Sequence, residues 1–173
     1  MRMRTLPTLI PALLLGSMLH AQGGPDAIVE TKVFHVPGQG ERVDVIISML
    51  GGSVTMGANE RGFQQARIEA ITIIEKNGAI ADFRKSVVNG PERTDSLHPD
   101  FIHQESFLLQ PGEHGLSIEL RDLVSGDSTA SRIRLPLPIG STPEGLFFSD
   151  VLLASQVNRS TDPKVARSGY EVL

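Results

Sequence analysis

A group of side chains that could bind a metal lies between Asp95 and Glu105. Its members are the carboxylates and imidazoles of Asp95, His98, Asp100, His103 and Glu105. His103 and Glu105 are two residues apart, so on a strand they would share a face and could approach one metal ion together. The spacing matches no motif tied to a mechanism, and such residues in a polar loop are usually solvated. A metal-binding module around His98 and His103 is therefore only a third hypothesis, and the sequence predicts no catalytic, cofactor-binding or metal-binding residue.

The other residue types that could do chemistry lack the neighbours that chemistry needs. Ser106 and Ser117 have no Gly-x-Ser-x-Gly elbow, which leaves a serine-hydrolase triad without an anchor. Gly51-Gly52 is not followed by the Gly-Lys-Ser/Thr of a phosphate loop. Asp122 and Asp127 flank a turn, where Asp is common for turn reasons alone. With no cysteine in the chain, thiol catalysis is excluded as well, and we expect the protein not to be an enzyme.

Three consecutive strands are predicted at Phe101–Leu109, Gly115–Leu123 and Thr129–Leu137, and the first of them carries His103 and Glu105. The second and third alternate apolar with polar residues, as expected of strands with one buried face. A two-residue loop at Ser125-Gly126 would set Ile118 opposite Ile133 and Glu119 opposite Arg132. A four-residue loop would oppose Arg121 to Arg132, a like-charge pair that lowers stability. We therefore expect the shorter loop.

The preceding chain also reads as strands. The segment from Phe63 to Glu75 could be a helix, but it is rich in β-branched residues and runs into Asn77-Gly78, a strong hairpin signal, so we predict a hairpin there. The residues from Gly57 to Gly62 read as a loop. The expected strands are Ile28–Val36, Arg42–Leu50, a short return at Ser53–Met56, Phe63–Glu75 and Ala79–Val88.

About seven strands with turn residues between them predict an all-β fold, an antiparallel β-sandwich of the immunoglobulin or fibronectin type. Such sandwiches often carry a tyrosine just after a corner of this kind, and the tyrosine hydroxyl bonds back to the upstream backbone. In this chain the corner is at Pro111-Gly112. Here His114 has that place, and we expect it to act as a substitute hydrogen-bonding ring rather than as a pH-responsive group.

The N-terminus has the features of a secretory signal peptide. Arg2 and Arg4 precede an apolar run that is too short for a permanent membrane span, and Ala21 suits the cleavage site. Without Arg2 and Arg4 the net charge falls from −4 to −6, and no basic cluster remains. These features predict an exported protein of the periplasm, outer envelope or extracellular space, with no nucleic-acid partner and no membrane span after cleavage.

The domain organisation follows from these signals. We expect a signal peptide at 1–21, a β-sandwich domain at 22–137, and at 138–173 a linker with one extra strand leading toward a possible following domain. The apolar run of Leu146–Leu153 would supply that strand. Asn158-Arg159-Ser160 matches a glycosylation acceptor pattern, a weak match that carries no functional prediction.

Several stretches resemble the N-terminal region of secreted bacterial proteins that carry a GWxTD domain further along. They are EAITIIEKNGAIADF at Glu69–Phe83, VVNGPERTD at Val87–Asp95, FLLQPGEHGLSIELRDL at Phe107–Leu123, and LFFSDVLLA at Leu146–Ala154. The GWxTD motif itself is absent, and members usually have Tyr at the position of His114. The resemblance implies a β-sandwich ahead of further domains and no catalytic residue.

From these observations we expect a non-catalytic exported β-sandwich module, a structural or protein-interaction unit of a bacterial cell-envelope protein. Its partners would be other proteins or a following domain of the same polypeptide. The alternative is an accessory domain of a secreted hydrolase or peptidase.

Overall fold

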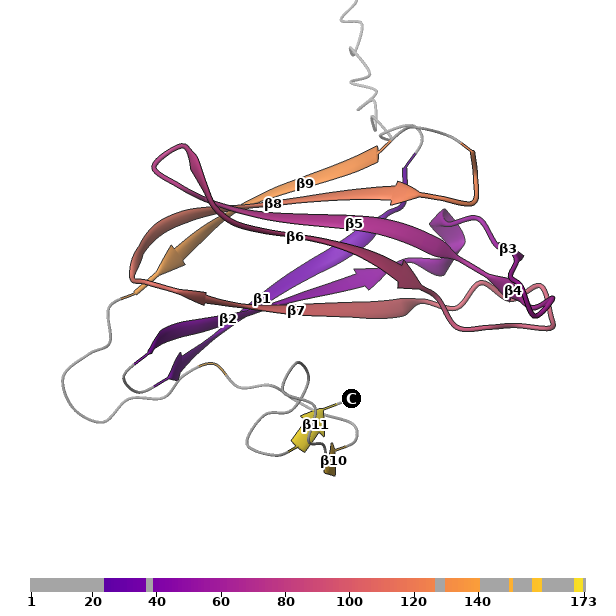
Figure 1. The fold of residues 1–173 in the computed structure, drawn as a ribbon, viewed down its shortest axis with the longest axis horizontal. Coiled ribbons are helices and arrows are strands. Elements are labelled where there is room, and N and C mark those ends of the chain that lie inside the picture. Colours follow the sequence, from indigo (N-terminus) through magenta and orange to yellow (C-terminus); the bar gives the residue numbers. More distant parts are fainter. Residues whose placement is uncertain are drawn as a thin grey trace, which may run out of the picture.

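The computed structural model describes residues 24–36, 39–126, 130–140, 150, 157–159 and 170–172. Two antiparallel sheets form a sandwich, one of three strands in the order β1-β2-β7 and one of four in the order β6-β5-β8-β9 (Figure 1). No α-helix occurs among these residues. The long strands are β1 (Ala27–Val36), β2 (Gly40–Met49), β5 (Arg67–Lys76), β6 (Ala79–Asn89), β7 (Phe101–Leu109), β8 (Gly112–Asp122) and β9 (Ala130–Ile139).

This architecture confirms the all-β sandwich. Seven long strands make up the two sheets. The shorter strands form two separate small hairpins, β3 (Gly57–Ala58) with β4 (Gln64–Gln65) and β10 (Val157–Arg159) with β11 (Tyr170–Val172). Each sheet buries one face against the other, which is the arrangement of an immunoglobulin-like or fibronectin-like domain.

The core comes from the inward-facing positions of both sheets. On β2 the four residues Val43, Val45, Ile47 and Met49 are fully buried, and they occupy every second position as a strand with one inward face requires. The central strands of the other sheet contribute Ile68 and Ile74 from β5 and Leu116, Ile118 and Leu120 from β8.

The sequence predicted two hairpins, one at Asn77-Gly78 and one between β8 and β9. Asn77 and Gly78 have φ angles of 54° and 78°, the positive values of a two-residue type I′ turn, so the hairpin reading of this region is confirmed over the helix. The register of β8 with β9 is also as predicted, with Ile118 opposite Ile133 and Glu119 opposite Arg132. The ladder is described as far as the pair Arg121–Ala130, and the residues that would close the predicted two-residue loop, at 127–129, lie outside the described part of the chain.

The segment after β2 differs from the prediction. Ser53–Met56 is not a return strand: a 3-10 turn covers Gly51–Ser53, and the first pairing comes later, where Gly57 faces Gln65 across the small β3–β4 hairpin. The predicted loop at 57–62 thus begins with a strand. The reason is the contact of Gly51 with the backbone of the distant residues His98 and Pro99, which fixes this segment as a turn.

Asp150, a described residue of the C-terminal part, lies beside β1. The Val33 N–H donates to Asp150 Oδ2 at 2.8 Å, and the Asp150 N–H donates to the Val33 carbonyl at 3.1 Å. Further along, β10 and β11 pair with each other, with Asn158 and Arg159 on β10. Apart from Asp150, the strand predicted at 146–153 lies outside the described residues, as do Asp127, Ser160 and the signal-peptide segment 1–21.

Candidate functional site

The five potential metal-ligating residues are divided among three places. Asp95 and His98 line a pocket at one end of the sandwich. The carboxylate of Asp100 accepts the Gly51 N–H at 2.8 Å and thus holds the turn after β2. His103 and Glu105 lie together on the inner face of β7. Among the described residues no group of three His, Cys, Asp or Glu side chains could hold a metal ion.

Glu105 is a buried carboxylate between the two sheets. Its Oε1 accepts hydrogen bonds from His103 Nε2 on its own strand and from Ser86 Oγ on β6 of the other sheet, each at 3.0 Å. Thr72 on β5 faces the same carboxylate, but its hydroxyl lies outside regular hydrogen-bond geometry and Oε2 has no partner. Burial raises the pKa of the Glu105 carboxyl, but the contacts with His103, Thr72 and Ser86 outweigh burial and leave this pKa below its usual value. Glu105 therefore links the sheets as an anion.

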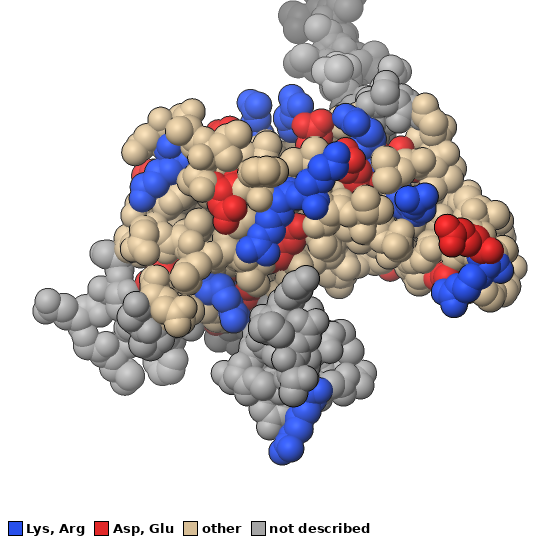
Figure 2. Space-filling view, viewed as in Figure 1, with Lys and Arg blue, Asp and Glu red and all other residues tan. Residues whose placement is uncertain are grey.

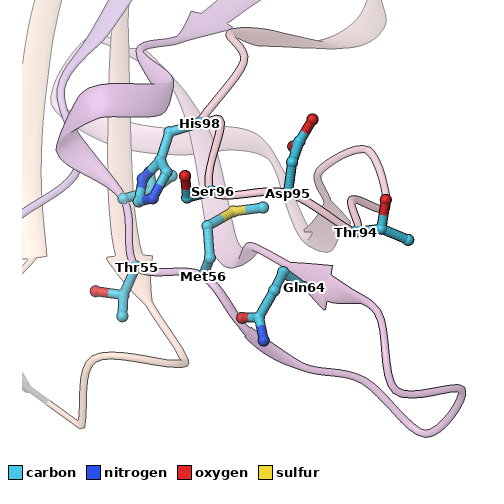
Figure 3. A pocket seen from close by; sticks show the side chains of 8 residues that line it. Thr55, Met56, Gln64, Thr94, Asp95, Ser96 and His98 are labelled. Carbon is cyan, nitrogen blue, oxygen red and sulfur yellow. The ribbon is translucent and has the colours of Figure 1, made fainter.

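The pocket lies at the end of the sandwich where the connections β2–β5 and β6–β7 meet, and we call this end the loop pole. Its volume is about 570 Å³, within the range of small-ligand sites. Met56 lies between the His98 ring and the Gln64 side chain, and the Asp95 carboxylate points away from it (Figure 3). The lining residues are Val54, Thr55, Met56, Gln64, Thr94, Asp95, Ser96 and His98.

Hydrogen bonds to the backbone hold the walls of the pocket in place. Gln64 and Arg93 exchange two backbone hydrogen bonds of 2.9 Å, which join β4 to the β6–β7 connection. Asp122, buried at the end of β8, accepts the N–H of Thr55 at 2.7 Å and that of Val124 at 2.8 Å. Asp122 thereby ties the β2–β5 connection to the loop after β8. The sequence predicted only that Asp122 flanks a turn. The pole is preorganised by these contacts.

The polar residues of the pocket are not arranged as a hydrolytic triad. Asp95, Ser96 and His98 are the residue types of a hydrolytic triad, but both oxygens of Asp95 accept from Arg93, at 2.9 and 2.5 Å. The hydrogen bond from Arg93 holds the pKa of Asp95 below its usual value. Among the described residues, no hydrogen bond joins Ser96 to His98. What remains is a set of hydroxyl, amide and imidazole groups around a thioether.

The two serines considered from the sequence also lack a histidine partner among the described residues. Ser106 is on the outer face of the three-stranded sheet, where its hydroxyl donates to the buried carboxylate of Asp44. Ser117 is on the outer face of the other sheet, opposite Arg134. Neither has a histidine as a hydrogen-bond partner among the described residues.

His114 is buried on the inner face of β8, and its Nδ1 donates to the Gly112 carbonyl at 3.0 Å. Because the acceptor is a carbonyl oxygen, Nδ1 must carry the proton. The ring thus bonds back to the upstream backbone at the corner, so the hydrogen bond expected of a ring at this position is present.

Sequence reasoning named only Asp95 and His98 among the pocket residues. It missed the five other polar or flexible side chains of the lining, which come from two separate loops: Thr55, Met56, Gln64, Thr94 and Ser96. One signal was available. In an antiparallel sandwich every second connection lies at the same end, so the connections after β2, β6 and β8 must meet.

Comparison with protein-family models, with curated proteins and with solved structures finds no match to this chain. In the described part of the chain, no helix is long and apolar enough to cross a membrane.

Proposed function

We propose that this chain is a non-catalytic β-sandwich module of an exported bacterial envelope protein, and that it recognises a protein partner through the loop pole. Loops held on a rigid scaffold are where binding residues concentrate in such folds. The module would serve either another polypeptide or a further domain of its own.

One observation carries the proposal. The backbone of the pocket walls is fixed by cross-loop hydrogen bonds, yet the one carboxylate among the lining side chains is neutralised by Arg93. Preorganised walls without a serine–histidine–carboxylate arrangement suit recognition of a surface better than bond cleavage. Leu97, which is 61% exposed in the same connection, adds an apolar contact beside the pocket.

The exported location rests on the sequence. The charged start, the short apolar run and Ala21 form a secretory signal, and the absence of cysteine leaves packing as the source of stability. The resemblance to the N-terminal region of GWxTD-domain proteins supports the same reading.

Site-specific photo-crosslinking in the native envelope tests the proposal. A photoreactive residue at Ser96 should give a discrete crosslinked protein, and the same residue at Arg134, exposed on β9 far from the pole, should not. The substitution Met56→Arg should weaken the Ser96 product by filling the pocket. Equal products at the two positions, or none at Ser96, would contradict recognition through the pole.

A further inference from the structure

We propose that the free edge of β6 is a second docking surface, distinct from the loop pole, which accepts an extended protein segment with alternating apolar and acidic residues. The segment would add a fifth strand to the four-stranded sheet. Main-chain hydrogen bonds would supply affinity, and the side chains of β6 would select the sequence.

The four sheet edges differ in how open they are. At β9, Pro136 and Pro138 lack the N–H groups that an added strand needs. At β1, Asp150 already bonds both the N–H and the carbonyl of Val33. The edges of β6 and β7 are covered by no other strand among the described residues. On β7, however, Glu105 is the single Asp, Glu, Lys or Arg side chain, and it is buried. The β7 edge therefore offers no exposed charged side chain that could select a partner.

The β6 edge combines apolar anchors with positive charge. Phe83 is 64% exposed and Val87 50% exposed, both on the outer face of the sheet. Next to Phe83 on β5 lies Ile73, half-buried, so the apolar surface extends onto the neighbouring strand. An extended partner that places apolar residues opposite Phe83 and Val87 would cover this surface.

Two cations occupy the middle of the same strand. Lys85 reaches Glu69 at 2.7 Å. Arg84 lies over the Phe107 ring at 4.7 Å and has no carboxylate partner among the described residues. Basic and acidic side chains lie side by side across the middle of the face in Figure 2. Arg84 shares the inner face of β6 with Val88, whereas Lys85 shares the outer face with Phe83 and Val87 and is already paired with Glu69. On an alternating segment whose apolar residues lie opposite Phe83 and Val87, the residue opposite Arg84 should therefore be acidic.

The same features disfavour a second copy of this chain as the occupant. β6 has a bulge, since Ile74 faces Asp82 whereas Glu75 faces Ile80, which leaves Ala81 as an extra residue. Regular pairing is thus limited to 82–89. Two copies joined antiparallel over this stretch would bring Arg84 and Lys85 of both chains together near the two-fold axis, and the like charges would repel.

The test uses the full mature chain and two short blocked peptides, one alternating valine with glutamate and one alternating valine with lysine. The valine–glutamate peptide should shift and protect the backbone amides of 82–89 in NMR spectra. The double variant Arg84→Glu/Lys85→Glu should weaken that binding by about tenfold or more and favour the lysine peptide. Arg134→Glu, on the opposite edge strand, is the matched control and should change nothing.

Three outcomes would overturn the proposal: no perturbation of β6 by the valine–glutamate peptide, equal perturbation by both peptides, or self-association of the chain mapped to β6. The neutral variant Arg84→Gln/Lys85→Gln guards against misfolding of the charge-reversed protein and should bind the two peptides alike. None of these results depends on crosslinking at the loop pole, so the two proposals fail separately.

Discussion

Glu105 is the residue whose ionisation should matter most for folding. Its charged form gains hydrogen bonds across the sheet interface, and its pKa in the folded state is lowered. Its contribution to stability is therefore present above the unfolded value of about 4.3 and is lost as the pH falls through the lower folded value.

We expect Glu105→Gln to lower the free energy of unfolding by about 1–2 kcal/mol at neutral pH, because a charged acceptor is replaced by a neutral one. The difference from the parent protein should shrink as the pH falls below about 4.3. Urea denaturation at a series of pH values measures this. Glu30→Gln, whose side chain is 60% exposed, is the control and should have little effect. A difference in the free energy of unfolding between variant and parent that stays constant with pH would show that Glu105 does not act through its charge.

Asp122 should matter for the loop pole. Its carboxylate accepts N–H groups from Thr55, Val124 and Ser125, and the side chain is buried. We expect Asp122→Ala to lower the free energy of unfolding by about 2–3 kcal/mol, because these three N–H groups lose their acceptor together. Asp122→Asn keeps the shape and one acceptor oxygen, so it should cost less. Thermal melting compares the variants, and equal losses would mean that the carboxylate acts only by filling space.

The turn between β2 and β3 shows how one element depends on a distant one. A Cβ at Gly51 would lie 2.0 Å from the carbonyl oxygen of His98, whereas a Cβ at Gly52 would meet nothing within 4 Å. The first glycine is needed for close approach of two loop backbones, and the second is not.

We expect Gly51→Ala to destabilise the protein by about 2–4 kcal/mol, as an overpacked site does, and Gly52→Ala to be nearly neutral. Gly51→Ala should also change the NMR shifts of the pocket residues Thr94, Ser96 and His98, because the two walls of the pocket must separate. Chemical denaturation with NMR measures both effects. Similar behaviour of the two variants would contradict the contact of Gly51 with His98.

At the scale of the whole molecule, the chain beyond β9 is tied to the edge strand of the other sheet, β1, at one described residue, Asp150. Its side chain and backbone take the positions that a neighbouring strand would take beside Val33. The contact covers part of the β1 edge, which would otherwise be open to pairing with another chain.

We expect Asp150→Ala to speed amide exchange at Val33 by removing the acceptor of its N–H, with no change at the central strands β2, β5 and β8. Hydrogen exchange followed by NMR gives the residue-level rates. Asp150→Asn retains an acceptor oxygen and should preserve most of the protection. Unchanged exchange at Val33 in the alanine variant would show that the contact does not persist in solution.

The sequence alone determined the fold class and much of the pairing. Alternation with a period of two specifies which face of a strand is buried, and a shift by one residue would expose every apolar side chain. The fully buried Val43 and Ile47 and the register that sets Ile118 opposite Ile133 follow from this rule. Asn77-Gly78 fixed its hairpin because few other residues adopt positive φ angles at both turn positions.

Only the tertiary structure decided the site. Gly51 contacts His98, which is 47 positions away in the sequence, and Asp122 binds Thr55, which is 67 positions away. No local sequence pattern encodes such contacts. The same holds for Glu105, whose inward position follows from alternation but whose partner Ser86 comes from the other sheet. Side-chain period and turn chemistry act between neighbours in sequence, whereas the pocket and the buried carboxylate depend on how two sheets and their loops pack in space.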